Sequence, residues 1–209
     1  TRFRMPSMIL RDWALANAGL LVSKVGGKPV YPYQPDKVWE ALAITKERNF
    51  DYPASTRDDL YRRSLYTFWR RTVGPVNMFD SSDRQACRVK PGKTSTPLHA
   101  LTTLNDPTWI EASRFLAEKI MLQTKETSDR LESAFRHVTA QTPSVAKLSV
   151  LERAYDEQLA IFNQNPQEAD KLLAIGEKKR NPKLSALEHA ALTQVCLGIL
   201  NLDQSLTRE

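Results

Sequence analysis

The same helix-start signal, a polar residue followed directly by proline, recurs in this chain and constrains its fold more than any other feature. Thr96 precedes Pro97, Asp106 precedes Pro107, and a further helix is expected to begin at Pro166. Proline suits the first turn of a helix because the N–H group that it lacks would have no intrahelical partner there. The chain holds 12 prolines but only 7 glycines. This balance favours helices separated by proline-led turns over a sheet with tight glycine turns.

Apolar residues recur with helical spacing along most of the chain. The pattern predicts helices near residues 7–21, 96–104, 107–123, 128–138, 143–162, 166–176 and 185–200. The last of these is almost continuously apolar, so we expect it to lie at the centre of the C-terminal half. Three prolines within residues 28–36 exclude a helix there and predict an extended strap. The sequence therefore predicts an all-α fold, an irregular multi-helix domain with a proline-rich extended strap and at most minor β pieces.

The length and apolar content of the chain fit one domain with a substantial core. It has 209 residues, of which 41% are hydrophobic. We expect a single helical domain over residues 1–209, with halves 1–125 and 126–209 as the alternative division. The chain begins in mid-pattern without methionine, so we expect it to be a fragment of a longer protein. No run of eighteen apolar residues exists, and no membrane span is expected.

An arginine-rich segment, Leu60–Pro107, is the least ordinary part of the sequence. It combines six arginines with large aromatic residues, among them Tyr61, Tyr66, Phe68 and Trp69; the arginines are Arg62, Arg63, Arg70, Arg71, Arg84 and Arg88. An arginine rarely leaves water unless a carboxylate, a set of carbonyl groups or an anionic ligand receives its donors. Two interpretations remain open, an internal lattice in which nearby aspartates neutralise the arginines and an open anion site.

The local structure of this segment is predicted less clearly than that of the other regions. A helix capped by Ser55 or Thr56 would place Leu65 on its inner face. It would also put Arg62 and Tyr66 four positions apart, close enough for a cation–π contact. Alternation at Leu65, Thr67 and Trp69 fits a strand instead.

Charge is unevenly distributed, which fits either an anionic partner or a solvated basic surface that has no partner. Residues 1–100 carry 17 Lys and Arg against 9 Asp and Glu, a net charge of +8, and the remainder carries −2. A positive field of this kind attracts acidic glycans, acidic protein surfaces or nucleic acid. Nucleic acid is disfavoured because no nucleic-acid-binding motif is present. We predict the binding residues to be Arg62, Arg63, Tyr66, Trp69, Arg70, Arg71, Arg84 and Arg88.

Few residues in the chain could carry catalysis. Asp80 and Cys87 are the candidates, since Arg84 and Arg88 would lower the pKa of a thiol between them. A structural role as a helix cap for Asp80 and as a small buried side chain for Cys87 is favoured. Cys87 and Cys196 lie far apart in the sequence, and we expect both to be unpaired.

We expect structural roles for the histidines and for the aromatic residues of the strap. His99, His137 and His189 have no acidic residues at ligand spacing, so we expect no metal and no cofactor in this chain. The tyrosines and tryptophan of the strap, Tyr31, Tyr33 and Trp39, are expected to pin it across the core. A shelf that binds carbohydrate or peptide is the alternative.

Six sequence blocks resemble a known protein family. They are RDWALANAGLL, GGKPVYPYQP, LYRRSLYTFWRR, FDSSDRQACRVKPGKTSTPLHALTTLNDP, AFRHVTAQTP and LNLDQSLTRE. In this order they resemble the domain of unknown function number fifteen fifty-three, found at the C-terminal side of large planctomycete-type proteins that often carry cytochrome c-like domains. The family more usually has glutamine where this chain has His99, which disfavours a catalytic or ligand role for that histidine.

The resemblance implies an extracytoplasmic accessory domain, in the periplasm or at the cell surface, and implies no reaction. The expected function is a binding or assembly module beside cytochrome c-like domains of the same protein, with an arginine and aromatic recognition surface. An acidic glycan is a further expected partner. The alternative is an enzyme domain that uses Asp80 and Cys87 on an anionic substrate such as an acidic polysaccharide.

Overall fold

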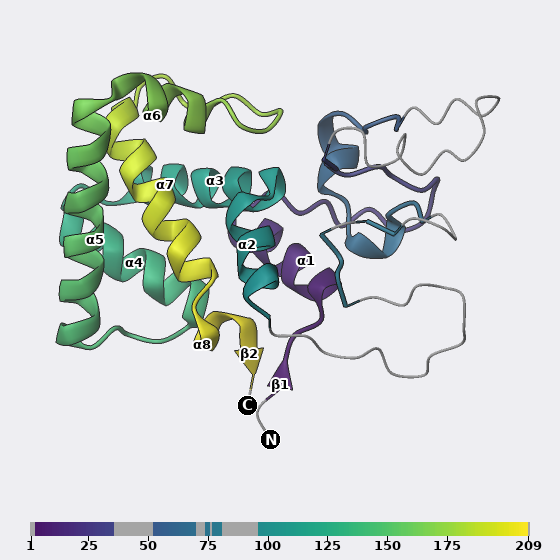
Figure 1. The fold of residues 1–209 in the computed structure, drawn as a ribbon, viewed down its shortest axis with the longest axis horizontal. Helices are drawn as coiled ribbons and strands as arrows, with labels where there is room; N and C mark the ends of the chain where they lie inside the picture. Colours follow the sequence, from purple (N-terminus) through teal and green to yellow (C-terminus); the bar gives the residue numbers. More distant parts are fainter. Residues whose placement is uncertain (1–2, 36–51, 70–73, 76, 81–95, 209) are drawn as a thin grey trace.

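The computed structural model describes residues 3–35, 52–69, 74, 75, 77–80 and 96–208, and within them the fold is all-α as predicted. Eight α-helices lie in these ranges, with two short 3-10 helices and one two-stranded sheet (Figure 1). The α-helices are α1 (Ser7–Asn17), α2 (Pro97–Asn105), α3 (Pro107–Gln123), α4 (Thr127–Thr139), α5 (Val145–Gln164), α6 (Pro166–Leu173), α7 (Ala186–Leu200) and α8 (Asp203–Leu206). The 3-10 helices are η1 (Arg57–Tyr61) and η2 (Ser64–Tyr66), and the strands are β1 (Phe3–Arg4) and β2 (Thr207–Arg208).

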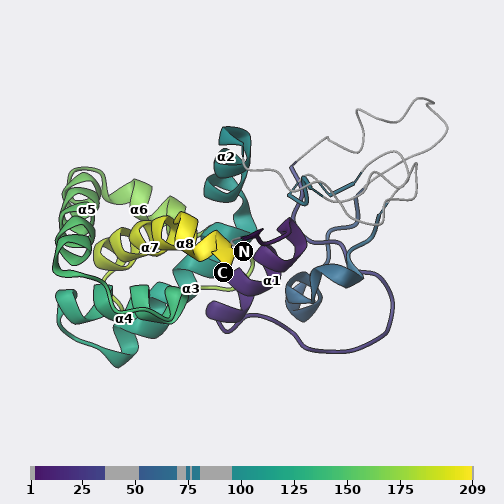
Figure 2. The same cartoon turned by 90° about the horizontal axis from the view of Figure 1, so that it is seen from below.

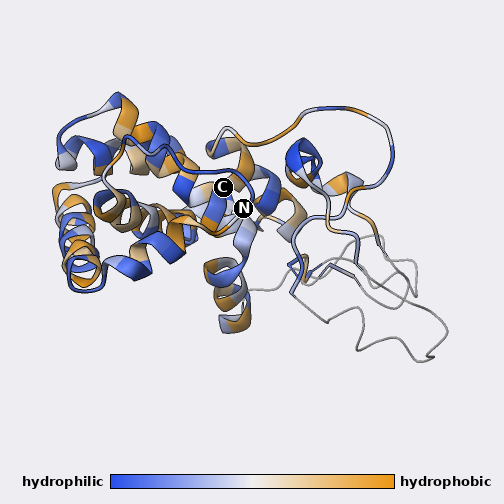
Figure 3. Ribbon diagram, turned by 90° about the horizontal axis from the view of Figure 1, so that it is seen from above, coloured by the Kyte–Doolittle hydropathy of each residue, from blue (hydrophilic) through white to orange (hydrophobic). Residues whose placement is uncertain are grey.

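Helix α7 lies at the centre of the helical part, as its apolar sequence predicts. It packs against α3, α5 and α6, and ten of its side chains are buried. Helix α3 contacts both α7 and α1, so it connects the C-terminal helices to the N-terminal part of the molecule. Figure 3 shows hydrophobic and hydrophilic residues alternating around the helices, the arrangement expected for amphipathic helices around a shared core.

The predicted helix starts are confirmed. The Thr96 hydroxyl accepts a hydrogen bond from the His99 N–H at 3.3 Å, directly before Pro97 begins α2. The Asp106 carboxylate accepts one from the Thr108 N–H at 2.8 Å at the start of α3. These side chains satisfy N–H groups that the first turn leaves without partners.

The two ends of the described chain lie side by side (Figures 1 and 2). Strand β1 pairs antiparallel with β2, with Phe3 opposite Arg208. The Met5 N–H continues the pairing by donating to the Leu206 carbonyl at 3.0 Å. One hydrophobic core cluster accordingly extends from Met5 to Leu206 and crosses residue 125. The extent of the cooperative domain stays a prediction.

The strap and the 3-10 helices form an irregular N-terminal layer, residues 20–35 and 52–69, beside α1 and away from α4 and α5 (Figure 2). Isolated parallel bridges join Val22 to Arg62 and Val30 to Thr67. Tyr31 stacks on Phe68, with ring centres 4.9 Å apart. Tyr33 reaches the core through a hydrogen bond to Glu111, described below, so the pinning role is confirmed for Tyr33, and Trp39 lies outside the described residues.

The prediction of a helix after Thr56 is wrong. Only the short turns η1 and η2 form, because the backbone of this stretch bonds to the strap: the Val30 N–H donates to the Tyr66 carbonyl at 2.8 Å, and the Phe68 N–H to the Val30 carbonyl at 2.8 Å. Leu65, expected on the inner face, is 67% exposed. A local pattern cannot reveal a partner segment thirty or more residues away.

Two side chains have an exposure that is unusual for their type. Arg11 on α1 is charged but only 2% exposed, and Val145 at the start of α5 is apolar but 88% exposed. Across the described residues, no helix is long and apolar enough to cross a membrane.

Candidate functional site

Arg62 of the arginine-rich segment is buried and bound to backbone carbonyl groups. Its guanidinium donates to the carbonyls of Lys28 and Lys24 at 3.1 Å each, and to that of Gly26. It also lies 4.1 Å from the ring centre of Tyr66, which confirms the predicted cation–π pair although no long helix joins them. One arginine thus holds the turn at residues 24–28 against η2.

A second buried arginine, Arg11 of α1, binds the backbone of residues 60–62. Its guanidinium donates to the Leu60 carbonyl at 2.7 Å and to the Arg62 carbonyl at 3.0 Å. Burial lowers the pKa of Arg11, and the charge of Asp12 opposes that shift. The contact to Asp12 is long, at 3.8 Å, so carbonyl groups are the closer acceptors.

Glu111 on α3 is the centre of a buried polar cluster. Its carboxylate accepts hydrogen bonds from the hydroxyls of Tyr61 at 2.9 Å and Tyr33 at 3.1 Å, and from the Lys178 N–H at 3.0 Å. Arg114, one turn further along α3, approaches the same carboxylate at 3.5 Å, and both side chains are fully buried. The cluster joins the strap, η1, α3 and the loop after α6 at one point.

The tyrosines of this cluster are held in their neutral form. Burial, with the nearby Glu111 charge, raises the pKa of Tyr33 to about 12 and raises that of Tyr61 further. A tyrosine in this environment donates its proton to a hydrogen bond and does not release it near neutral pH. The cluster therefore suits cohesion better than proton transfer.

The loop after α6 closes over Glu111 at a glycine. Gly176 has a φ of +95°, and a Cβ atom there would lie 2.3 Å from the Glu111 carboxyl carbon. Both the left-handed backbone and the close approach require glycine. The next residue, Glu177, donates its N–H to the Tyr33 hydroxyl at 2.8 Å.

Asp80, one of the two catalytic candidates, caps a distant helix. Its carboxylate accepts hydrogen bonds from the Ser7 N–H, at 3.0 Å to each oxygen, and from the Ser7 hydroxyl. Ser7 is the first residue of α1, so Asp80 has a capping role, as expected, and the helix that it caps is α1. The turn after Asp80, which the sequence predicts it to cap, lies outside the described residues.

The remaining described members of the predicted surface lie outward or half-buried. Arg63 is 50% exposed, and its guanidinium lies 3.9 Å from Asp12. Tyr66 and Trp69 are half-buried, and the Tyr66 hydroxyl accepts a hydrogen bond from the Gly26 N–H at 2.9 Å. The other predicted residues, Arg70, Arg71, Arg84, Arg88 and Cys87, lie outside the described residues.

His99, His189 and Cys196 lie in the packed interior, whereas His137 is exposed, with its ring Nε2 3.0 Å from the Asn17 carbonyl. His189 is fully buried and lies 3.0 Å from the Arg114 carbonyl, and burial lowers its pKa. The His99 ring bonds to Arg4 at 2.9 Å and packs on Phe79. Cys196 is a buried free thiol whose pKa burial raises. In the part of the chain that the structure describes, no three side chains of metal-ligand type converge.

Sequence reasoning missed Arg11, Glu111 and Arg114. Each is charged and lies on a predicted amphipathic helix, where the usual expectation is a solvated face. Glu111 and Arg114 are three positions apart, on one side of α3 with the apolar residues. Two charged residues on the apolar side of a helix were the one sequence signal for this buried polar cluster.

A family model matches residues 1–155: PSD1, described as a protein of unknown function (DUF1553). No curated protein and no solved structure matches the chain. Five of the six blocks named above lie within the matched residues, and LNLDQSLTRE lies beyond them. Since the match covers well over half of the 209 residues, the chain belongs to this family of proteins of unknown function, DUF1553.

Proposed function

We propose that the chain is a non-catalytic binding module whose arginine-rich segment holds the fold together on its inner side and binds an anionic surface on its outer side. The ligand chemistry is a polymeric array of carboxylate or sulfate groups, from an acidic glycan or from the acidic face of a neighbouring domain. Placement outside the cytoplasm beside cytochrome c-like domains is part of the proposal and rests on the family resemblance alone.

The observation that supports this proposal most is the alternation of side chains around Arg62. Tyr61, Arg62 and Ser64 are buried and hydrogen-bonded to other segments of the chain, while Arg63 and Leu65 are exposed. Arginine keeps its proton near neutral pH, so an exposed arginine offers anion binding but no proton transfer. The net charge of +8 on residues 1–100 also favours the binding of an anionic surface.

The position of Asp80 supports the binding module better than the enzyme alternative. A general acid or base needs a carboxylate that can exchange a proton with a substrate. Three hydrogen bonds from Ser7 engage both oxygens of Asp80 at the start of α1. Cys87, the other candidate, lies outside the described residues.

Salt elution from immobilised heparin and immobilised polygalacturonate tests the binding proposal. We expect Arg63→Glu to elute at lower salt than the wild-type chain, because a cation that contacts a sulfate or carboxylate array releases counterions from it, and this contribution is lost with the cation. Arg153→Glu is the matched control. Its side chain is 73% exposed on α5, and the substitution changes the net charge by the same amount.

Equal effects of the two substitutions would show attraction to net charge alone and would contradict the proposal. If the wild-type chain passes both columns freely but retains a neighbouring domain of its own protein, that domain is the anionic surface. Turnover of an acidic polysaccharide that disappears in Asp80→Ala would replace the binding module by the enzyme.

A further inference from the structure

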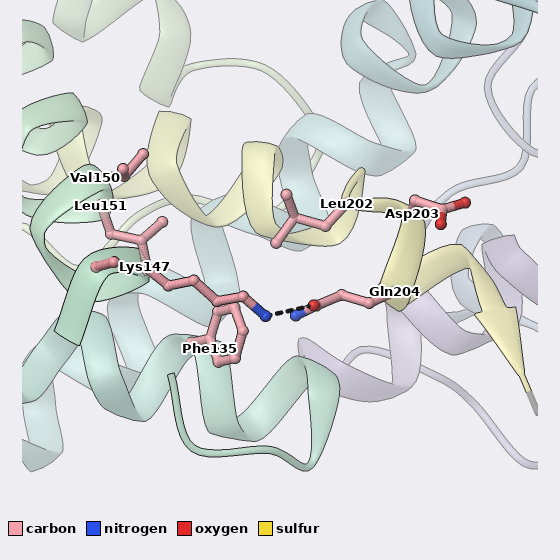
Figure 4. A pocket seen from close by; sticks show the side chains of 8 residues that line it. Phe135, Lys147, Val150, Leu151, Leu202, Asp203 and Gln204 are labelled. Carbon is pink, nitrogen blue, oxygen red and sulfur yellow. Dashed lines mark hydrogen bonds between the residues drawn. The ribbon is translucent and has the colours of Figure 1, made fainter. Parts of the chain in front are cut away.

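A groove lined mainly by apolar side chains lies between α4, α5 and α8, away from the arginine-rich segment (Figures 1 and 4). Its volume is about 540 Å³. Sites for small organic ligands typically have volumes of roughly 300–1,000 Å³ with an apolar lining and a few polar groups. The lining residues that matter here are Phe135, Lys147, Val150, Leu202 and Gln204.

Two polar side chains meet across the groove. Lys147 Nζ donates to Gln204 Oε1 at 2.9 Å and lies 5.4 Å from the ring centre of Phe135. Figure 4 shows Lys147 and Gln204 reaching toward each other from α5 and α8, next to the Phe135 ring. This bond fixes the amide orientation, because the flipped amide would place an NH₂ group against the ammonium. Gln204 Nε2 is buried and has no hydrogen-bond partner among the described residues.

The polar end of the groove favours negative charge. Lys147 lies in the first turn of α5, a helix of 20 residues whose Ser144 cap accepts from the Lys147 N–H. The positive end of the helix dipole therefore adds to the ammonium charge. Asp203 also lines the groove, but its carboxylate points away from the Lys147–Gln204 pair in Figure 4 and interacts electrostatically with Arg4.

We propose that this groove binds a small amphipathic monocarboxylate, of which a medium-chain fatty acid is the simplest example. The apolar chain lies along Phe135, Val150 and Leu202. The carboxylate accepts hydrogen bonds from Lys147 Nζ and from the otherwise unused Nε2 of Gln204. Val150 and Leu202 are 54% and 37% exposed, and such a ligand would cover them. The Lys147 ammonium can serve the ligand and Gln204 Oε1 together because it has three donors.

Titration of the 209-residue chain with octanoate, decanoate and octanol tests this assignment, followed by calorimetry or by protein NMR. We expect affinity to rise by about fourfold for each added methylene, the value for burial of one CH₂ group. Octanol, which lacks the charge, should bind about tenfold more weakly than octanoate. Lys147→Met should cost octanoate about tenfold in affinity while octanol binding is unchanged.

Two control substitutions distinguish a specific binding site from nonspecific hydrophobic binding. Lys183 is exposed in the loop before α7, and Lys183→Met should bind octanoate like the wild-type chain. Val150→Asp places a carboxylate in the apolar part of the groove and should abolish binding of both carboxylates. These readouts do not depend on heparin or polygalacturonate, so the groove and the anion-binding surface can fail independently.

Three results would overturn the assignment. One is the absence of binding by every probe at millimolar concentration. Another is equal affinity for octanol and octanoate, or an unchanged octanoate affinity in Lys147→Met. The third is tighter binding of a short peptide that ends in leucine than of decanoate, which would make a peptide C-terminus the occupant.

Discussion

At the scale of single residues, Glu111 is a charged side chain kept inside a helical core by three segments distant in sequence. Tyr33, Tyr61 and the backbone of Lys178 all donate to its carboxylate. A buried carboxylate that loses one of these donors keeps the full cost of its desolvation. The hydroxyl groups of Tyr33 and Tyr61 therefore contribute more to stability than a tyrosine hydroxyl that is exposed to water.

We expect Tyr61→Phe to lower the free energy of unfolding by about 1–3 kcal/mol, the cost of an unsatisfied buried acceptor. Urea denaturation measures this. Tyr66→Phe is the matched control, because its hydroxyl bonds to the Gly26 N–H at an exposed position where water can replace it. Equal losses in the two variants would contradict a special role for Glu111.

The raised tyrosine pKa values predict a loss of stability at high pH. In the folded chain Tyr33 has a pKa of about 12, against an ordinary value of 10.0, and the pKa of Tyr61 is raised as well. Between these two pH values the unfolded chain loses protons that the folded chain retains, so stability is complete below pH 10.0 and falls as pH rises toward 12. Unfolding free energies measured across this window should decline, and Tyr33→Phe should reduce the slope. Ionisation of both tyrosines at their ordinary pKa in the folded protein would show that the cluster is open to water.

At the scale of elements, helix α1 is capped by a residue more than seventy positions away. Asp80 receives the hydrogen bonds of Ser7, the first residue of α1. Loss of a capping side chain costs roughly 0.5–2 kcal/mol. We expect Asp80→Ala to fall in this range by thermal or urea unfolding, and Asp58→Ala, at an exposed position in η1, to have a smaller effect. An Asp80→Ala variant as stable as the wild-type chain would mean that its carboxylate does not support α1.

The loop after α6 predicts a difference between two glycines with similar backbones. Gly176 and Gly19 both have positive φ, at +95° and +72°, but only at Gly176 would a Cβ atom overlap Glu111. Gly19→Ala therefore measures the backbone strain alone, roughly 1–2 kcal/mol. Gly176→Ala should cost clearly more, because Glu111 or the loop must shift. Equal melting temperatures for the two variants would refute the close packing of this loop on α3.

The elements differ in how far they could be predicted from the sequence. The starts of α2 and α3 depend on Thr96–Pro97 and Asp106–Pro107, which act on their own backbone, and both were predicted. The turns η1 and η2 depend on hydrogen bonds to the strap, and a helix was predicted there instead. The buried roles of Arg11 and Glu111 depend on carbonyl and hydroxyl groups from other segments. The one local signal was the position of Glu111 and Arg114 on the apolar side of α3.

At the scale of the whole molecule, one core cluster connects both ends of the chain. It extends from Met5 to Leu206, and the Glu111 cluster ties the N-terminal layer to α3 and to the loop after α6. We therefore expect a single cooperative unfolding transition, with coincident curves from circular dichroism and tryptophan fluorescence. Two separate transitions would support the alternative division near residue 125.

The arginine-rich segment is proposed to have an inner and an outer side, and one pair of substitutions tests this division most directly. Arg62→Lys keeps the charge but loses the planar fork that binds the carbonyls of Lys24 and Lys28, and Arg63→Lys makes the same change at a side chain that is 50% exposed. We predict that urea denaturation will show a loss of about 1.5–3 kcal/mol for Arg62→Lys, the range for hydrogen bonds of charged groups. For Arg63→Lys we predict a change within about 0.5 kcal/mol, as for other surface substitutions. Equal stabilities of the two variants, or a larger loss for Arg63→Lys, would contradict the account.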